Sequence, residues 1–520
     1  MTNSDSQAEI KAFLANPASY PAGPDRVEIF ETHGALVFLA GEEAWKIKRA
    51  VRFPYMDLST LEKRRAVCER EVEINRKWAP QIYLGCVPIT RESNGRLCFD
   101  GKGEPVEWAV RMRRFAQSDL LGSIADTRGI DREMARSLAD AAFESHAAAQ
   151  RADNPNGAER FGDLVNSVSR NLAGVSDILG TEETARFRQL AEIQHARAAA
   201  VLDQRAAQGF VRRCHGDLHL GNIVMWDGRP TLFDAIEFDE ELATIDTLYD
   251  LAFLLMDLDH RGLRPAANIV LNRYLWRSQE DSDLDGLVAL PLFLGLRAGV
   301  RALVTAERAQ QEQASQNQEA AVQQSARARG YLRSALGYLT PSEPALVAVG
   351  GLSGTGKSTL AAVLAPRIGP CPGAVHLRSD LERKALFGRE ETERLDAEAY
   401  TKDVTARVYS QLMKKTQRVL AAGHGVIVDA VFAAENERRA LEKIAEEAGV
   451  KLKGLWLTAP PEILMKRVAQ RRNDASDATV DVVKLQLGYE IGSLSPAWTT
   501  IDAGQDLEGT VKDAEAALVK

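Results

Sequence analysis

A glycine-rich segment in the C-terminal third of the chain carries its strongest chemical signal. Residues 351–358 read GLSGTGKS and match the pattern GxxxxGK[ST]. An apolar run precedes the segment and a helical pattern follows it, so its backbone N–H groups would surround a phosphate at a helix N-terminus. The lysine adds a positive charge there, and the serine can bind Mg²⁺. The sequence therefore predicts a nucleoside triphosphate site made by Gly351, Gly354, Gly356, Lys357, Ser358 and Thr359.

Two carboxylates and an arginine downstream could act on that triphosphate. Asp380 ends the segment AVHLRSD and stands three residues before Arg383, at the start of a predicted helix. Asp380 could accept the proton of an attacking hydroxyl, and Arg383 could orient the acceptor molecule; helix capping is the alternative. Asp429 follows the buried-strand pattern GVIVD and is predicted to bind Mg²⁺, with a contact to the acceptor as the alternative.

A later pair of arginines has helical spacing. Arg467 and Arg471 are four residues apart in a predicted helix, which would place both on one face. We interpret them as a clamp on the phosphate during its transfer, and a solvated charged surface is the alternative.

These motifs together resemble the P-loop kinases that include polynucleotide 5'-kinases, zeta toxins, chloramphenicol phosphotransferases and gluconate kinases. The resemblance covers about residues 345–520. It implies ATP-dependent phosphorylation of a hydroxyl group with Asp380 as the base. Relatives of this kind differ in their acceptors, so the resemblance does not fix the substrate.

A second set of chemical residues lies in the N-terminal half. Residues 215–222 read HGDLHLGN, and Asp234 lies twelve residues beyond Asn222. An Asp, an Asn five residues later and an Asp at the end of a short strand is the spacing that kinases use for the base and the metal ligands. Asp217 would steer the acceptor hydroxyl, while Asn222 and Asp234 would bind metal. The alternatives are a turn held by hydrogen bonds and a transition-metal site that uses His215, His219 and Asp217.

Such a site also needs a lysine that binds phosphate and a glutamate that orients the lysine. The strand-like AWKIKR supplies Lys46, and the helical CEREVEINRKW supplies Glu71 on its buried side. Lys48 and Glu73 are the neighbouring alternatives. We expect residues 32–35 to cover the phosphates, and residues 106–112 to form the connection that contacts adenine.

Residues 25 to about 335 resemble the aminoglycoside phosphotransferase family, on the strength of HGDxxxxN and the later Asp. The resemblance implies a protein-kinase-like fold. The chain lacks the GxGxxG loop and the APE segment of protein kinases, so protein substrates are not expected.

The surrounding patterns indicate which elements hold these residues. Residues 26–115 alternate like an antiparallel sheet with one helix, and residues 119–339 are mainly helical. A polar break with two prolines at 338–344 precedes alternating strands and helices. We predict an α+β bilobal kinase-like domain over 1–340 (N-lobe about 25–115, C-lobe about 116–340). An α/β P-loop kinase domain with a mainly parallel sheet is predicted over 341–520.

Composition narrows the remaining choices. The chain has 520 residues and a net charge of -8, which suits a folded cytoplasmic protein and gives no general attraction to nucleic acid. Five scattered cysteines suggest neither disulfides nor zinc. The apolar run at 287–304 contains two arginines, so no membrane span is expected.

We therefore expect a bifunctional ATP- and Mg²⁺-dependent phosphotransferase whose two domains act on hydroxyl groups of small molecules. Two alternatives stay open. One is a regulatory nucleotide-binding protein with one non-catalytic domain, and the other is a C-terminal polynucleotide 5'-hydroxyl kinase. Nucleic-acid binding is not favoured, because residues 341–520 show no basic stripe. The sequence leaves the oligomeric state open.

Overall fold

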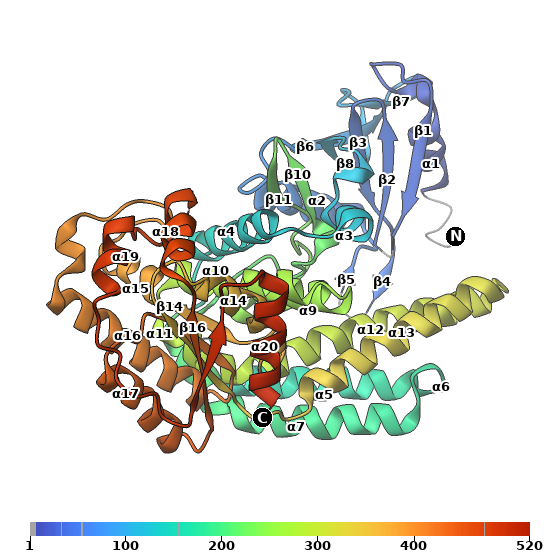
Figure 1. Cartoon of the computed structure of the whole chain (residues 1–520). Helices are drawn as coiled ribbons and strands as arrows, with labels where there is room; N and C mark the ends of the chain where they lie inside the picture. Colours follow the sequence, from blue (N-terminus) through green and yellow to red (C-terminus); the bar gives the residue numbers. More distant parts are fainter. Residues whose placement is uncertain (1–6, 33, 54–55, 154, 473, 520) are drawn as a thin grey trace. The chain divides into compact units, whose positions relative to one another are not determined.

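The computed structural model in Figure 1 describes residues 7–519 except 33, 54–55, 154 and 473. By its contacts the chain divides into two compact units. Unit 1 comprises Met1–Pro155 and Gly209–Leu254, and unit 2 comprises Asn156–Gln208 and Leu255–Lys520. Helices of the N-terminal half thus belong to the same unit as the C-terminal half. The domain boundary near residue 340 stays a prediction.

Unit 1 is built on an antiparallel sheet with the strand order β1-β2-β3-β8-β6-β7. Its two faces are covered by different helices. Ile10 and Leu14 of α1 pack with Phe38 and Trp45 on one face. On the other face, α2 brings Cys68 and Val72 against Val110 and Met112. The elements are α1 Ala8–Ala15, β1 Val27–Glu31, β2 Ala35–Ala40, β3 Glu43–Lys48, β4 Arg52–Phe53, β5 Met56–Asp57, α2 Leu61–Asn75, β6 Tyr83–Arg91, β7 Leu97–Phe99 and β8 Glu104–Arg113.

Strand β8 corrects one expectation. Residues 106–112 lie inside this strand, which pairs with β3 on one side and with β6 on the other. They therefore do not form a connection. The alternation of buried and exposed residues in EWAVRMR suits a central strand. His33, in the predicted phosphate-covering segment, lies outside the described residues.

The rest of unit 1 holds short strands around the HGD segment. These elements are α3 Leu121–Arg128, α4 Arg132–Ala148, β9 Val211–Arg213, β10 Ile223–Trp226, β11 Arg229–Leu232, α8 Glu240–Ala243 and β12 Thr244–Asp246. The hairpin of β10 and β11 ends at Leu232, two residues before Asp234. Helix α9, Thr247–His260, crosses from unit 1 into unit 2.

Unit 2 begins with helices that include a long antiparallel pair, α12 and α13. The helices of this part are α5 Ala158–Gly174, α6 Ser176–Leu179, α7 Thr181–Ala207, α10 Arg264–Ser278, α11 Asp281–Asp285, α12 Leu290–Ala314 and α13 Gln318–Leu339. Among the described residues, the segment Asp281–Ala314 is long and apolar enough to cross a membrane by length and composition alone. Its most apolar window is 72% buried inside the structure, as it would be in a core helix of a soluble protein.

The C-terminal part of unit 2 is a parallel sheet with the order β14-β15-β13-β16-β17, which confirms the predicted mainly parallel α/β architecture. Leu360 of α14 and Ala514 of α20 pack on the face that also holds Val349 and Leu455. The elements are β13 Leu346–Gly351, α14 Lys357–Leu364, β14 Val375–Arg378, α15 Ser379–Leu386, α16 Lys402–Ala421, β15 Val426–Asp429, α17 Glu435–Glu447, β16 Leu452–Thr458, α18 Pro461–Gln470, α19 Val480–Gln486, β17 Trp498–Asp502 and α20 Leu507–Val519.

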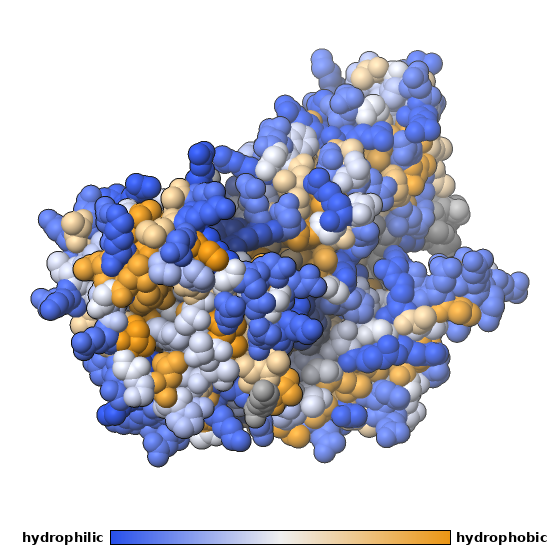
Figure 2. Space-filling model, viewed as in Figure 1, coloured by the Kyte–Doolittle hydropathy of each residue, from blue (hydrophilic) through white to orange (hydrophobic). Residues whose placement is uncertain are grey.

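The surface in Figure 2 is mostly hydrophilic, with apolar side chains in small groups. Large exposed apolar residues come from well-separated parts of the sequence, for example Ile29, Val322 and Leu485. Singly exposed apolar residues are ordinary on a protein surface.

Candidate active sites

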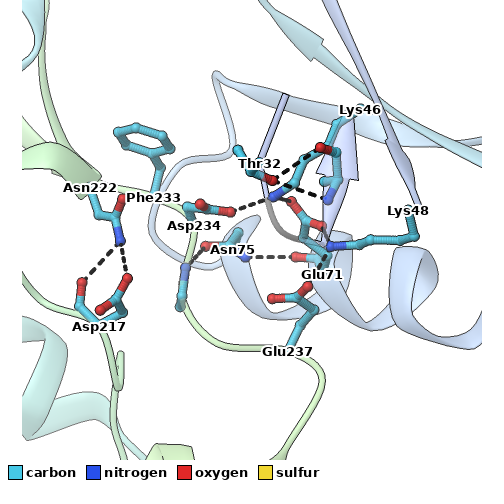
Figure 3. A network of polar contacts seen from close by, with 12 residues as sticks. Thr32, Lys46, Lys48, Glu71, Asn75, Asp217, Asn222, Phe233, Asp234 and Glu237 are labelled. Atoms are coloured by element: carbon cyan, nitrogen blue, oxygen red, sulfur yellow. Dashed lines mark hydrogen bonds and ion pairs between the residues drawn. The ribbon is translucent and has the colours of Figure 1, made fainter. Parts of the chain in front are cut away.

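The first site is built around a group of two lysines and three carboxylates in unit 1, of which Asp234 is partly exposed and the others are largely buried (Figure 3). Lys46 on β3 contacts Glu71 on α2 at 2.9 Å and Asp234 at 2.5 Å. Lys48, two residues along the same strand, contacts the other oxygen of Glu71 at 2.5 Å and also pairs with Glu237. Glu71 is fully buried. Both lysines therefore share one glutamate, and of the two it is Lys46 that reaches Asp234.

Glu73, the alternative to Glu71, lies elsewhere. Its carboxylate pairs with Arg70 at 2.8 Å on the exposed side of α2. Burial by itself lowers the pKa of Lys46, but the carboxylates of Asp234 and Glu71 raise that pKa well above its usual value. Lys46 is therefore held as a cation beside two anions.

The HGD segment brings the other predicted residues of this site together. The Asn222 amide nitrogen donates to the Asp217 carboxylate at 2.8 Å and to its backbone carbonyl at 3.0 Å. The backbone N–H groups of His215 and Gly216 donate to Asp250 at 3.1 and 2.9 Å. Gly216 has a φ of +85°, which favours glycine. The segment is therefore held from behind by Asp250, and the Asp217 carboxylate stays partly exposed.

The contacts of the two histidines disfavour a transition-metal site. The ring nitrogens of His215 contact the Phe233 carbonyl at 2.9 Å and the Asp217 backbone N–H at 3.3 Å. His219 accepts from the Gly221 N–H through Nδ1. Burial lowers the pKa of His215. Both rings thus use nitrogens to fix the turn, which is the structural alternative for these histidines.

Three residues of the site were missed by sequence reasoning. Glu237 pairs with Lys48, the Tyr83 hydroxyl accepts the Asp234 backbone N–H at 3.1 Å, and the Asn75 side chain accepts the Ala235 N–H at 2.8 Å. Glu237 lies three residues after Asp234, and this short spacing was a usable signal. Tyr83 and Asn75 are more than 150 residues from Asp234 and Ala235 in sequence, so folding brings them to the site and no local pattern marks them.

The second site lies where strands β13, β14 and β15 end in unit 2. Gly351 and Gly354 have φ values of +134° and +88°, and an added Cβ would meet the Leu457 carbonyl at 2.6 Å or the Leu464 carbonyl at 2.7 Å. These two glycines are therefore required by close backbone contacts. Gly356, also at positive φ, precedes α14, whose first residue is Lys357. Ser358 and Thr359 follow in the opening turn of α14.

Lys357 faces the carboxylates of this site. Its ammonium group donates to the Leu352 carbonyl at 3.1 Å within the loop. Burial lowers the pKa of Lys357, and the charges of Asp429 and Asp380 oppose that shift. Both predicted acids thus act electrostatically on the predicted phosphate-binding lysine. The Ser353 N–H donates to Gln486 of α19 at 2.7 Å, a loop contact that no sequence pattern announced.

Asp380 and Asp429 differ in their surroundings. Asp429 is the last residue of β15 and lies 3.6 Å from His376 and 3.8 Å from Arg378. Although burial raises the pKa of Asp429, the hydrogen bond with His376 and the charge of Lys357 hold that pKa below its usual value. Burial raises the pKa of Asp380 against the opposing charge of Arg378. One acid is thus favoured as an anion, and the other has the raised pKa of a proton acceptor.

The three predicted arginines take different positions. Arg383 is buried, donates to the Ala399 carbonyl at 2.5 Å and lies over the Tyr400 ring. Arg467 donates to the Ala503 carbonyl at 2.7 Å. Arg471 pairs with Asp474 at 3.5 Å, and its charge acts on Lys357.

The expectation that Arg467 and Arg471 share a helix face is wrong, because α18 ends at Gln470. Arg471 has the extended dihedral angles φ -64° and ψ 134°, so its side chain leaves the chain in a different direction. Of these two arginines, Arg471 is the one whose charge acts on the predicted phosphate-binding lysine, Lys357.

Comparison with known families agrees with this two-site arrangement. Residues 66–287 match a family model described as "Phosphotransferase enzyme family", and residues 346–489 match one described as "AAA domain". The chain therefore combines a phosphotransferase-family domain with a P-loop kinase domain, as the sequence predicted.

Individual relatives cover one or both halves. Uncharacterized proteins of Mycobacterium tuberculosis H37Rv and Mycobacterium bovis are 29% identical over 465 residues, 88% of this chain and of theirs. A gluconokinase from Sinorhizobium meliloti 1021 is 21% identical over 34% of this chain and 92% of its own, with a TM-score of 0.26. An aminoglycoside 2'-phosphotransferase-IIIa is 14% identical over 62% of this chain and 99% of its own, with a TM-score of 0.37.

Proposed function

We propose that the protein is a bifunctional ATP- and Mg²⁺-dependent phosphotransferase. Each site would move the γ-phosphate of ATP to a hydroxyl group of a small molecule. The observation that carries the proposal is the presence, at each of two separate places, of a lysine for phosphate beside carboxylates with distinct environments. A chain with one non-catalytic domain would not need both sets.

In the first site, Lys46 would bind phosphate oxygens while Glu71, which also pairs with Lys48, holds it in place. Asn222 uses its amide nitrogen on Asp217, so its amide oxygen remains to bind Mg²⁺ together with Asp234. These hard oxygen donors fit Mg²⁺, which would neutralise charge on the phosphates. Asp217 would accept the hydrogen bond of the acceptor hydroxyl and orient it for attack.

In the second site, the loop 351–358 would bind the phosphates, with Ser358 and Asp429 as the Mg²⁺ ligands. Asp380 would take the hydroxyl proton, because its raised pKa makes it the better proton acceptor of the two acids. Arg471 and Lys357 would stabilise the charge that develops on the transferred phosphate. Arg383 would contact the acceptor molecule.

The test is ATP consumption by the full chain against sugars, aminoglycosides, nucleosides and oligonucleotides. Asp217→Asn and Lys357→Ala variants assign each activity to a site. We expect small hydroxylated acceptors for both sites. Labelling of an oligonucleotide 5'-hydroxyl that weakens steeply with salt, with small acceptors inert, would refute the small acceptor at the second site. ATP hydrolysis that no acceptor stimulates would favour the regulatory alternative.

A further inference from the structure

Helix α10 belongs to the predicted N-terminal domain, residues 1–340 (called the N-terminal half below), but it lies along the edge of the C-terminal sheet. Strand β14 is an outer strand and pairs only with β15. On its other side, the His376 N–H donates to the Asn272 side-chain oxygen at 2.6 Å. The amide nitrogens of Asn268 and Asn272 donate to the Ala374 carbonyl at 3.0 and 3.2 Å. Side chains of α10 thus occupy the hydrogen-bonding positions of a missing neighbouring strand.

The same helix also reaches the turn that carries Asp380. The Trp276 indole N–H donates to the Leu381 carbonyl at 3.4 Å, inside the first turn of α15. Asn268, Asn272 and Trp276 are spaced by four residues, so one face of α10 contacts first the strand and then the helix that follows it. The position of Asp380 is therefore set by the N-terminal half as well as by its own sheet.

A buried ionic bridge runs from α10 into the second site. Arg273 contacts one carboxylate oxygen of Glu391 at 3.5 Å, and the other oxygen contacts Arg378 at 3.3 Å. The side chains of all three residues are about nine-tenths buried. Arg378 lies 3.8 Å from Asp429. Glu391 is thus shared between an arginine from the N-terminal half and the arginine beside the predicted metal ligand.

Charge balance makes this bridge sensitive to Arg273. Arg378 also contacts Asp474, so three carboxylates compete for one guanidinium group. Without Arg273, Glu391 would lose one of its cationic partners, and Arg378 would be drawn toward Glu391. An unpaired buried charge is costly, so the site would rearrange to avoid it.

We propose that α10 is part of the second active site and that Arg273 is a positioning residue, which holds Arg378 beside Asp380 and Asp429 through Glu391. The inference rests on the proposed phosphotransferase function of that site. It goes further by assigning to the N-terminal half a role in the reaction of the C-terminal half.

The chain offers a matched control one turn further along α10. Arg277 contacts Glu390 at 2.9 Å, and Glu390 is mostly exposed. This pair has the same charges and joins the same two segments. Glu390 also lies 3.6 Å from Arg273, but Glu391 is the carboxylate that contacts Arg378. A general weakening of the α10 contact would affect both pairs, whereas the proposed positioning of Arg378 runs through Arg273 and Glu391.

The experiment uses the full chain with Asp217→Asn as background, so that only the second site turns over. ATP hydrolysis with water as the acceptor is measured, and the rate of a matching Lys357→Ala protein is subtracted. We expect Arg273→Gln to lower kcat at least tenfold while KM for ATP stays within twofold. Arg273→Lys should recover most of the rate, and Arg277→Gln should stay within twofold of the background. Equal losses in Arg273→Gln and Arg277→Gln would overturn the proposal.

A second readout separates this proposal from the proposed function. If the background protein shows no ATP turnover that depends on Lys357, the phosphotransferase function of this site fails. Hydrogen exchange of the α15 amides then decides the inference. Faster exchange in Arg273→Gln than in Arg277→Gln supports the bridge, and equal exchange refutes it.

Discussion

Replacing Lys48 with methionine should destabilise unit 1 strongly although Lys48 does not reach Asp234. The Lys48 ammonium is 4% exposed and serves both Glu71 and Glu237, whose side chains are 0% and 8% exposed. Glu71 would keep Lys46, but Glu237 would lose its ion-pair partner. Breaking a buried pair by removing one partner costs about 3–5 kcal/mol, and we expect a loss in that range.

A second substitution, Glu237→Gln, completes a double-mutant cycle because it removes the buried carboxylate that Lys48→Met leaves unpaired. Adding Glu237→Gln to Lys48→Met should restore at least about 2 kcal/mol, because the double variant buries no unpaired carboxylate. Lys63→Met is the control. Lys63 pairs with Asp57 at 2.5 Å but is half exposed, so its loss should cost less than about 1 kcal/mol.

The dependence on pH gives a further check on this variant. Burial raises the pKa of Glu237 despite the nearby Lys48, so Glu237 takes up a proton more easily in the folded than in the unfolded protein. A raised carboxyl pKa stabilises the fold at low pH, and that contribution is lost as pH rises through the folded-state value. Without Lys48 the pKa should rise further. The loss in Lys48→Met should therefore be larger at pH 8 than at pH 5.

Urea titration with pulse proteolysis measures these free energies when peptides from β3 and α2 are followed. A loss below about 1 kcal/mol in Lys48→Met would contradict the reasoning. So would a double variant whose loss equals the sum of the two single losses. Either result would mean that water reaches the group of charges and screens it.

Three further predictions concern the reactions. Asp217→Asn should lower acceptor-dependent ATP consumption at the first site by about 10²–10⁴ and leave the second unchanged, and Lys357→Ala should do the reverse by about 10²–10³; loss of both activities from one change in a folded protein would contradict two independent sites. Asp234→Ala should weaken binding of Mg·ATP more than binding of ATP in EDTA, as titration calorimetry can measure, and equal weakening would remove Asp234 from the metal site. At the second site, kcat/KM should fall with decreasing pH as Asp380 takes up a proton, at a pH above the usual carboxyl range because burial raises the pKa of Asp380. Arg378→Met should move this acidic fall in kcat/KM to still higher pH, because the charge of Arg378 lowers the pKa of Asp380. A pH profile that does not move would argue against Asp380 as the base.

The residues that sequence reasoning located are those whose geometry is local. Asp217 and Asn222 lie within one short segment, so their spacing alone largely determines that they meet. Lys357 follows from the loop that ends at a helix N-terminus. Lys46 and Glu71 were found because a buried strand position and a buried helix position of opposite charge favour pairing.

The residues that were missed depend on distant chain segments. Asn272 and Arg273 lie about a hundred residues before the strand and loop that they contact, and nothing in their own segment marks that face of the helix. Arg471 was misplaced for a different reason, which is the uncertainty of a helix end. It is four residues after Arg467, as helical neighbours are, but α18 ends at Gln470, so the two side chains do not share a helix face.

The hydrogen bonds from α10 side chains to strand β14 bear on whether either half of the chain can be moved into another protein by itself. A fragment that starts at residue 341 would expose the outward N–H of His376 and carbonyl of Ala374, and open edges of this kind pair with other chains. Cutting the chain at residues 338–344 would therefore leave β14 with an unpaired edge that can bind other chains, and it would leave the second site without α10. The mycobacterial relatives align over 465 residues, longer than either half, so they too carry both halves in one polypeptide. We therefore expect a C-terminal fragment without α10 to aggregate, and moving this half into a new protein would require another helix in the place of α10.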